Sequence, residues 1–541
     1  MASVVGFALQ REILHSRQLK TLPDTIGSLT NLESLVLHFL DEVMILPETL
    51  GNLHSLQKLE LGHCGIKCLP ESLGWLSCLT HLKIASCYEL ESLPDTIGGL
   101  SNLESLVLQH LNKLMTLPEA LGNLHSLQKL ELWHCGTRSL PEGLGWLSCL
   151  THLEITDCGE LKVLPDTVGG LSNLKSLVLQ HCKLMTLPET LGNLQSLQKL
   201  ELLHCRIGSL PESLGWLSCL THLKIAYSDE LKTLPDTILG LSNLESLVLK
   251  HLDKLMTLPE ALGNLHSLQK LKRVDCEIES LPEGLGRLTG LKRLKIKQCG
   301  NLKTLPDTIG GLFNLESLVL QHLDKLMTLP EAIGNLHPLQ KLELVHSGNL
   351  KTLPDTIGDL FNLESLVLQH LHKLMTLPEA LGNLHSLQKL ELVHCGNLKT
   401  LPDTIGGLFN LESLVLQHLD KLMTLPEALG NLHSLQKLEL VHCGNLKTLP
   451  DTIGGLFNLE SLVLQHLDKL MTFPEALGNL HSLLKLELAH CGIKSLPGSI
   501  GWLSCLTYLK IRSCDELKTL PDTIGSLSNS SRSTWKSSLP P

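Results

Sequence analysis

Residues 395–414 read CGNLKTLPDTIGGLFNLESL, and close variants of this stretch fill most of the chain. A Leu-Pro pair, once Phe-Pro, marks each copy, and successive pairs lie 23 or 24 residues apart. Twenty-two such pairs enclose 21 complete units. Because the sequence repeats itself from end to end, the repeat, and not an independently folding domain, is the expected building unit.

Each unit contains the pattern L-x-x-L-x-L-x-x-(C/L), as at Leu127, Leu130, Leu132 and Cys135. Its x-L-x-L-x centre alternates with period two, which predicts a strand with one buried face. Pro followed by Asp or Glu then opens a short helical turn, because Pro tolerates the first helical position and an acid favours the positive end of a helix. Gly and Asn, as in Gly122-Asn123, end the turn. Stacked units are expected to place their strands in one parallel sheet.

These units resemble the leucine-rich-repeat superfamily over residues 8–528. The resemblance implies an α/β solenoid, a horseshoe or arc, with a parallel β-sheet on the concave face and short helical or 3-10 segments on the convex face. We expect a degenerate half-repeat at residues 1–22, where Ala8 and Arg11 replace Leu, and the solenoid at residues 23–528. The Ser-rich residues 529–541 are expected to form a disordered tail.

The units fall into three types, which read NLESLVLQH, SLQKLELxH and CLTHLKI, the last following a Trp. The types alternate with a period of three units as far as Pro306. From Pro306 to Pro450 the prolines of corresponding units are 48 residues apart, and the blocks between them are nearly identical. Duplication explains this pattern, and it gives the chain a repeating surface.

Composition excludes several classes of function. The net charge is −11, whereas nucleic-acid binding would need a broad basic face. No run of 18 apolar residues occurs, so no membrane span is expected. The phosphate-binding GxxxxGK loop, GxSxG, HExxH and the kinase motifs are absent, so we expect no catalytic, cofactor-binding or metal-binding residues.

The 17 cysteines follow the repeat, and most occupy its ninth position, as Cys395 and Cys443 do. In the family this position is buried at the turn that leaves the strand, where a free thiol behaves as a small hydrophobe. No CxxC spacing supports a zinc or redox site. A buried ladder of free thiols favours a reducing compartment, so the chain is expected to be cytoplasmic. The single glycosylation sequon, at Asn529, agrees with this expectation.

The eighth position is His in 14 units. Adjacent strands are about 4.8 Å apart, so these rings should form a column along one edge of the sheet. The column includes His346, His394, His442 and His490. Imidazoles in a column could bind metal, could gain charge near pH 6 and repel each other, or could simply result from duplication. The adjacent His-Cys pairs are not expected to be catalytic, since consecutive strand residues point to opposite faces.

A second column consists of carboxylates on the concave face. Glu343, Glu391, Glu439 and Glu487 recur on every second predicted strand, about 9.6 Å apart. Together with the His column they are a candidate protein-binding surface. The alternative is that the Glu residues serve solubility.

One region departs from the acidic pattern. Residues 268–297 place five cations at concave positions of two adjacent predicted strands: Lys270, Lys272, Arg293, Lys295 and Lys297. Arg273 falls where buried Leu is usual, and because a bare buried Arg is costly we expect a local bulge that turns Val274 inward. The five cations are a candidate site for an acidic protein segment, a phosphate or another anion. Sequence drift is the alternative explanation.

The form C-x-x-L-x-x-L-P-[DE]-x-[IL]-G-x-L is similar to the repeat region of plant intracellular nucleotide-binding immune receptors (disease-resistance proteins) and to plant intracellular Ras-group leucine-rich-repeat proteins. The resemblance implies a non-catalytic module that recognises protein ligands on its concave face in signalling or plant defence. The nucleotide-binding and signalling domains of immune receptors are missing here. The alternatives are a multivalent assembly scaffold and a substrate-recruiting subunit of an enzyme complex such as a ubiquitin ligase.

Overall fold

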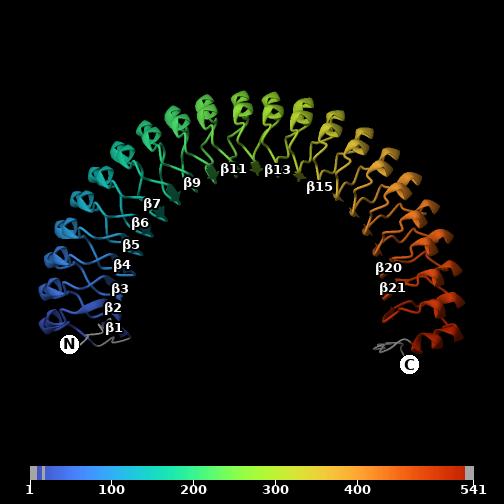
Figure 1. Ribbon diagram of the computed structural model, residues 1–541, viewed down its shortest axis with the longest axis horizontal. Coiled ribbons are helices and arrows are strands. Elements are labelled where there is room, and N and C mark those ends of the chain that lie inside the picture. The colour runs from blue at the N-terminus through green and yellow to red at the C-terminus, as the bar shows by residue number, and fades with distance from the viewer. Residues whose placement is uncertain (1–8, 15–18, 530–541) are drawn as a thin grey trace, which may run out of the picture. The chain divides into compact units, whose positions relative to one another are not determined.

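A computed structural model describes residues 9–14 and 19–529 (Figure 1). Part of the expected N-terminal half-repeat (residues 1–8 and 15–18) and the expected Ser-rich tail (residues 530–541) lie outside the described residues. The chain forms two units, Met1–Leu268 and Gln269–Pro541. In each of them the strands lie side by side on the inner side and the 3-10 helices on the outer side (Figure 1).

The first unit contains parallel strands that each pair with the next along the chain. They are β1 (Leu9–Leu14), β2 (Leu32–Leu40), β3 (Lys58–Cys64), β4 (His81–Ala85), β5 (Ser105–Gln109), β6 (Lys129–Trp133), β7 (His152–Thr156), β8 (Ser176–Gln180), β9 (Lys199–Leu203), β10 (His222–Ala226) and β11 (Ser246–Lys250). Its 3-10 helices are η1 (Asp24–Ser28), η2 (Glu48–Asn52), η3 (Glu71–Trp75), η4 (Asp95–Gly99), η5 (Glu119–Asn123), η6 (Glu142–Trp146), η7 (Asp166–Gly170), η8 (Glu189–Asn193), η9 (Glu212–Trp216), η10 (Asp236–Gly240) and η11 (Glu260–Asn264).

The second unit follows the same plan, again with parallel pairing between consecutive strands. Its strands are β12 (Lys270–Val274), β13 (Arg293–Lys297), β14 (Ser317–Gln321), β15 (Lys341–Val345), β16 (Ser365–Gln369), β17 (Lys389–Val393), β18 (Ser413–Gln417), β19 (Lys437–Val441), β20 (Ser461–Leu467), β21 (Lys485–Cys491) and β22 (Tyr508–Arg512). Its 3-10 helices are η12 (Glu283–Arg287), η13 (Asp307–Gly311), η14 (Glu331–Asn335), η15 (Asp355–Asp359), η16 (Glu379–Asn383), η17 (Asp403–Gly407), η18 (Glu427–Asn431), η19 (Asp451–Gly455), η20 (Glu475–Asn479), η21 (Gly498–Trp502) and η22 (Asp522–Asn529).

The expected α/β solenoid is therefore confirmed. Within β18, the inward residues Leu414 and Leu416 are fully buried, and they lie in register with Leu390 and Leu392 of β17. The same two positions are buried in strand after strand. Each layer adds one row of leucines to a core that continues through the unit, which explains why so few aromatic residues are needed.

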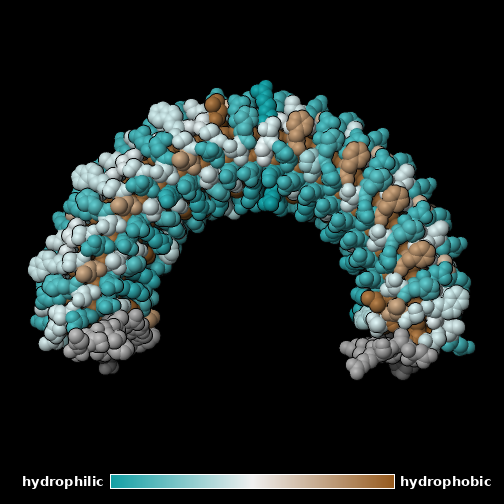
Figure 2. Space-filling view, in the orientation of Figure 1, coloured by the Kyte–Doolittle hydropathy of each residue, from teal (hydrophilic) through white to brown (hydrophobic). Residues whose placement is uncertain are grey.

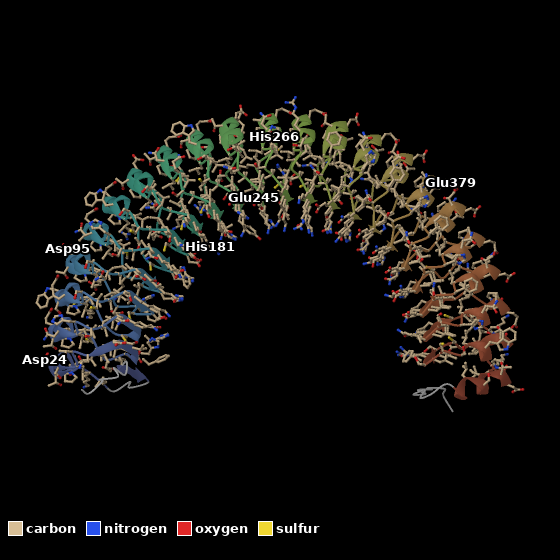
Figure 3. The ribbon with its side chains drawn as sticks, viewed as in Figure 1. Asp24, Asp95, His181, Glu245, His266 and Glu379 are labelled. Carbon is tan, nitrogen blue, oxygen red and sulfur yellow. The ribbon has the colours of Figure 1, made fainter. Side chains whose placement is uncertain are left out.

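The helical segments of the repeat are 3-10 helices that begin one residue later than expected. Pro402 has an extended backbone, with φ −66° and ψ 148°, and it caps η17 instead of occupying its first turn. The Pro402 carbonyl accepts a hydrogen bond from the Ile405 N–H at 3.1 Å. The acid that follows Pro can also bridge units: the Glu119 side chain accepts a 2.8 Å hydrogen bond from the Gly143 N–H, one unit further along. Figure 3 shows Asp95 and Glu379 on the helix side and His181 on the strand side.

Glycine lets consecutive 3-10 helices approach each other closely. A Cβ atom at Gly430 would lie 2.3 Å from the carbonyl oxygen of Thr452 in the next helix. No side chain fits in that distance, so the recurring Gly of the Leu-Gly-Asn segment is required by the stacking of the units.

Candidate functional site

The exposed face of the sheet is formed by the first, third and fifth residues of each five-residue strand. This surface is called the strand face below. On β17 those residues are Lys389, Glu391 and Val393, whereas Leu390 and Leu392 between them are buried. The parallel register places equivalent residues of neighbouring strands opposite each other, so the composition of the strand face follows directly from the alignment of the units.

The five predicted cations lie together on this face and are called the basic patch: Lys270, Lys272, Arg293, Lys295 and Lys297. The register of β12 and β13 places Lys270 opposite Arg293 and Lys272 opposite Lys295. On the other side of β13, the residues opposite these cations are Ser317, Val319 and Gln321 of β14, which carry no charge. Like charges directly opposite each other destabilise a sheet, so folding alone does not favour this arrangement.

The lysine at the centre of the patch has an altered acidity. The pKa of Lys295 is lowered, first by burial and then by the charge of Lys297 beside it. Glu343 acts in the opposite direction but does not outweigh these effects. Of the described residues, none forms an ion pair with Lys295. The Lys295 ammonium therefore lies in a positive field that an anion would relieve.

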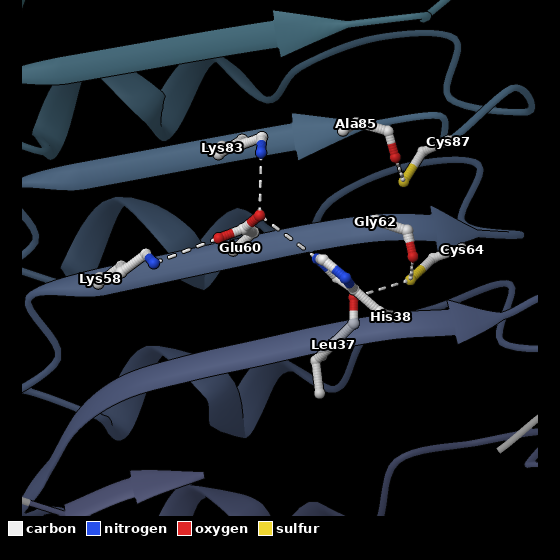
Figure 4. Close-up of polar contacts among 9 residues, drawn as sticks. All are labelled: Leu37, His38, Lys58, Glu60, Gly62, Cys64, Lys83, Ala85 and Cys87. Atoms are coloured by element: carbon white, nitrogen blue, oxygen red, sulfur yellow. Dashed lines mark hydrogen bonds and ion pairs between the residues drawn. The ribbon is translucent and has the colours of Figure 1, made fainter. Parts of the chain in front are cut away.

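Equivalent lysines elsewhere are neutralised by a cross-strand glutamate, a feature that the sequence analysis missed. Lys83 of β4 lies opposite Glu60 of β3, with their charged atoms 3.0 Å apart (Figure 4). The same register joins Lys224 to Glu201 at 3.6 Å and Lys510 to Glu487 at 2.6 Å. On β12 this Glu is replaced by Lys272. Alignment of the units shows that Lys replaces Glu, but only the register between neighbouring strands shows that this Lys lies opposite Lys295.

The pKa of Glu60 shows that the surrounding lysines favour its ionised form. Burial raises the pKa of Glu60, but hydrogen bonds and charges from Lys83 and Lys58 outweigh burial and lower the pKa overall. Lys58 lies 3.3 Å and His38 3.5 Å from the Glu60 carboxylate (Figure 4).

The predicted bulge at Arg273 is wrong. β12 pairs with β13 without a shift, and Arg273 lies opposite Ile296, with 1% of its surface exposed. Val274 therefore remains on the strand face. The guanidinium lies near the thiols of Cys276 and Cys299: burial lowers the pKa of Arg273, and these two groups act in the opposite direction. Uninterrupted pairing of the strand and the polarisable sulfur atoms together explain why the arginine stays inside.

The glutamates of the predicted Glu column lie on the strand face, but their charges are balanced. Each of its glutamates forms an ion pair with a lysine two residues earlier on the same strand. The pairs are Lys341–Glu343 at 2.8 Å, Lys389–Glu391 at 2.9 Å, Lys437–Glu439 at 3.0 Å and Lys485–Glu487 at 3.1 Å. Gln321 and Gln369 also donate hydrogen bonds to Glu343 and Glu391. The column therefore presents dipolar pairs and not a uniform acidic stripe.

The His column is present, and its rings stack face to face. From His322 to His490, through His346, His370, His394, His418, His442 and His466, successive ring centroids are 3.8 to 4.4 Å apart. All of these residues have a positive φ, for example 54° at His394. His is one of the few residue types enriched in that conformation, so the backbone itself helps to explain why His recurs there.

Stacking affects the acidity of the rings. The pKa of His370 is lowered to about 4, first by burial and then by the positive charges that neighbouring His346 and His394 would carry. The pKa of His418 is lowered by the same causes. The pKa values of His346 and His466 are lowered in the same way, so these four rings favour the neutral form. Within residues 9–14 and 19–529, no group of three or more His, Cys, Asp or Glu side chains is placed to hold a metal ion.

The thiols at position nine are buried, as expected, except for the half-buried Cys514. All 17 cysteines are free. The thiol of Cys395 donates a 3.6 Å hydrogen bond to the Leu368 carbonyl of the preceding unit, and burial raises its pKa to about 11. The pKa of Cys443 is raised to about 11 by the same cause, so both thiols stay protonated and unreactive at neutral pH, which agrees with a structural role.

Comparison with known proteins identifies the repeat. A family profile described as a leucine-rich repeat region matches residues 40–134, 116–206, 200–305 and 298–421. The chain belongs to the leucine-rich repeat family. Leucine-rich repeat proteins are generally protein-interaction modules, and their fold is typically a non-catalytic scaffold. No curated protein sequence matches the chain.

Solved leucine-rich repeat structures resemble this fold. A leucine-rich repeat protein of Leptospira interrogans is 30% identical, with a TM-score of 0.55, and the match covers 70% of this chain and 94% of that one. The plant peptide hormone receptor RGFR1, solved in complex with RGF2, is 24% identical, with a TM-score of 0.48, and the match covers 94% of this chain and 91% of that one. The Arabidopsis receptor kinase HAESA, solved with the peptide hormone IDA and the co-receptor SERK1, is 22% identical, with a TM-score of 0.48 and coverage of 94% and 87%. Among the described helices of this leucine-rich repeat chain, none has the length and apolar character needed to cross a bilayer.

Proposed function

We propose that the protein is an intracellular recognition module that binds an acidic segment of a partner protein at the basic patch on β12 and β13. One comparison within the chain carries the proposal. Lys83, Lys224 and Lys510 each face a glutamate on the preceding strand, whereas Lys295 faces Lys272. Lys295 thus has a cation in place of the cross-strand carboxylate that its equivalents have, in a chain whose net charge is −11.

An acidic protein segment is the ligand that suits this surface. The patch extends over two positions of β12 and three of β13, so it is larger than a single phosphate. Arg293 supplies a guanidinium that can hold a carboxylate through two parallel hydrogen bonds. Charge complementarity would also speed association and suppress binding of basic partners. Nucleic acid is not the proposed ligand, because the rest of the strand face carries balanced Lys–Glu pairs and no continuous basic surface.

The proposed cytoplasmic location is supported by the exposed free thiols, which would be open to oxidation outside a reducing compartment: Cys68, Cys78, Cys149, Cys219 and Cys505. A role in signalling or plant defence is supported by the similarity of the repeat units to those of plant intracellular immune receptors. Fractionation of source cells with an antibody to the chain, or imaging of a fluorescent fusion, tests the location directly.

The basic patch is tested by recovering partners from source-cell extract and identifying them by mass spectrometry. One variant carries Lys272→Glu alone, which restores the residue found opposite Lys83, Lys224 and Lys510 and is therefore expected to fold. A second reverses all five cations of the patch. A partner that binds the patch should be reduced by the single substitution and lost with the fivefold reversal.

The matched control changes the same number of charges elsewhere in the second unit. Lys303, Lys351, Lys399, Lys447 and Lys494 are exposed in the loops that follow the strands, and all five are replaced by Glu. Far-ultraviolet circular dichroism confirms that each variant folds. Equal recovery of all partners by the wild type, the patch variant and the control variant would contradict the proposal.

A multivalent scaffold is the second candidate function, because the blocks of 48 residues present the same Lys–Glu pairs at regular intervals. Stoichiometry separates the two functions. Light scattering of the purified complex should give one partner per chain for a recognition module and several for a scaffold.

A further inference from the structure

A polar groove of about 530 Å³ lies along the edge of the second unit where the strands begin, away from the basic patch. It is lined by side chains one or three residues before the starts of β16 to β20: Glu364, Ser386, Gln388, Asn410, Glu412, Ser434, Gln436 and Asn458. This surface is called the edge groove. Its residues come from the nearly identical blocks, so its chemistry repeats along its length.

Carboxylates and amides alternate along the floor of the edge groove. The Gln388 N–H donates to the Glu364 carbonyl at 2.8 Å, and the Glu412 N–H donates to the Gln388 carbonyl at 2.8 Å. These bonds continue the strand ladder, so Glu364 and Glu412 are two strands apart, at about 9.6 Å. Both glutamates are exposed, and neither forms an ion pair within the part of the chain that the structure describes.

Exposed aromatic residues are the sequence neighbours of two groove residues. Phe409 and Phe457 directly precede the groove residues Asn410 and Asn458, and each is 57% exposed. The ring of His385 stacks on Phe409 with a centroid distance of 5.5 Å, and its Nδ1 lies 3.0 Å from the Gly407 carbonyl oxygen. Figure 2 shows apolar residues at regular intervals on the visible surface of the second unit. Exposed phenylalanines in a regular row beside a polar groove are typical of a binding surface.

The first unit lacks this combination at the corresponding positions. Where the second unit has Phe, the first has Ser101, Ser172 and Ser242. Its carboxylates Glu104 and Glu245 are not joined by an alternating Glu-Gln series, because Thr151, Lys175 and Thr221 occur in the same column. The repeat fold therefore does not require either the phenylalanines or the regular carboxylates of the second unit.

We propose that the edge groove binds a polyproline II segment that carries a basic residue at every third position. A polyproline II helix has three residues per turn and rises about 3.1 Å per residue, so equivalent side chains recur at about 9.3 Å. That repeat matches the carboxylate spacing of about 9.6 Å, whereas side chains on one face of a β-strand recur at about 6.7 Å. The match assigns the basic residues to Glu364 and Glu412.

The remaining groups of the groove suit the same ligand. Proline rings of the bound segment lie against Phe409, Phe457 and the stacked His385, as in other aromatic-lined sites for proline-rich peptides. The side-chain amides of Gln388 and Gln436 can donate hydrogen bonds to the ligand backbone, whose carbonyls are not used internally in a polyproline II helix. This site is separate from the basic patch and has the opposite charge, so each proposal can fail without the other.

The experiment uses the full chain and a fluorescent peptide of repeated Pro-Pro-Arg triplets, with binding measured by anisotropy. A second peptide has the same composition and length, but its arginines are grouped in adjacent pairs. The triplet peptide should bind about ten-fold more tightly than the grouped one. The double variant Glu364→Gln/Glu412→Gln should weaken triplet binding about ten-fold, which corresponds to the loss of two solvent-accessible ion pairs.

Two further variants make the result interpretable. Phe409→Ser/Phe457→Ser introduces the residue that the first unit has naturally, so the chain should fold while peptide affinity falls. Glu104→Gln/Glu245→Gln makes the carboxylate change in the first unit and should leave affinity unchanged. Absence of binding, equal binding of the two peptides, or equal loss in the groove and control variants would each overturn the proposal.

Discussion

Arg273 occupies a position that belongs to leucine or isoleucine in the other units. Its equivalents in the second-type units include Leu61, Leu132 and Leu344, which are fully buried. Burial lowers the pKa of Arg273, which shows that the surroundings disfavour the charge. The arginine is kept at a cost to stability, while the strand ladder stays in register.

Arg273→Leu is therefore expected to stabilise β12 and β13 by about 1 kcal/mol or more, because replacement of buried ionic groups by apolar ones is often stabilising. Hydrogen exchange measured by mass spectrometry should show slower exchange at the backbone amides of these strands. The reciprocal variant Leu344→Arg in β15 serves as the control and should speed local exchange. Faster exchange in Arg273→Leu would mean that the guanidinium makes a net favourable contribution.

At this scale, prediction from sequence succeeded for the buried cysteines and for the existence of the His column, but it failed for the orientation of Arg273 and did not foresee the backbone conformation of the histidines. The burial of Cys395 could be predicted from one unit alone, because the repeat has a small apolar position at the end of each strand. The orientation of Arg273 depends on the pairing of β12 with β13, which a single unit does not reveal. The positive φ at His394 leaves no trace in the spacing of the leucines, although the preference of His for that conformation is a weak signal.

The stacked His column gives one element of the fold a predictable response to pH. The pKa of His370 is about 4 in the folded chain, below its ordinary value of 6.5, so the unfolded chain binds more protons between these two values. Stability contributed by the neutral ring is therefore fully present above about pH 6.5 and is lost as the pH falls toward about 4. Acid should destabilise the second unit in that window.

The quadruple variant His346→Asn/His370→Asn/His418→Asn/His466→Asn is expected to lose part of this acid sensitivity. Asn tolerates a positive φ, so the backbone conformation should persist. Thermal melting at pH 7 and at about pH 4.5 should show a smaller fall in Tm for the variant than for the wild type. Replacement of the exposed His54, His125 and His266 by Asn is the control; an equal change in that control would rule out the column as the cause.

The strands and helical segments could be predicted because each depends on a short stretch of sequence: alternating residues for a strand, and Pro-Asp or Pro-Glu for the start of a helical segment. The placement of Pro402 before η17 shows the limit of that reasoning, since one residue separates a helix cap from a first turn. Cross-strand pairs such as Glu60 with Lys83 require a register between units. Once the units are aligned, the register is fixed by the Leu rows, and the unusual Lys272–Lys295 pair becomes visible.

On the scale of the molecule, the repeating blocks should be removable in whole periods. Deletion of residues 403–450 removes 48 residues and joins Pro402 to Asp451, which preserves the order of the unit types. β17 would then pair with β20 through Lys389 and Ser461, the same residue types that pair now. Because stability in repeat proteins is mainly a sum of unit and nearest-neighbour terms, we expect the Tm to change by only about a few degrees.

The control deletion removes half a period. Loss of residues 403–426 takes out 24 residues and joins Pro402 to Glu427, which places β17 beside β19. Lys389 would face Lys437 and Glu391 would face Glu439, so like charges would oppose each other in register. Differential scanning calorimetry should show a clearly lower Tm for the half-period deletion. An equal loss in the two deletions would mean that cross-strand chemistry contributes little.

Because these blocks are nearly identical, strands of the second unit can pair with the wrong partner while the chain folds. Ser365 pairs with Lys389, Ser413 with Lys437 and Ser461 with Lys485. The pairing residues therefore do not distinguish β16, β18 and β20 from one another. During refolding, β16 can dock on β19 as favourably as on β17, because β17 and β19 have the same sequence, with the intervening units looped out. Such shifted pairings are local traps, because escape requires the misplaced layers to separate. Refolding of the second unit should therefore show several slow phases at low denaturant concentration, whereas the more varied first unit has fewer interchangeable partners.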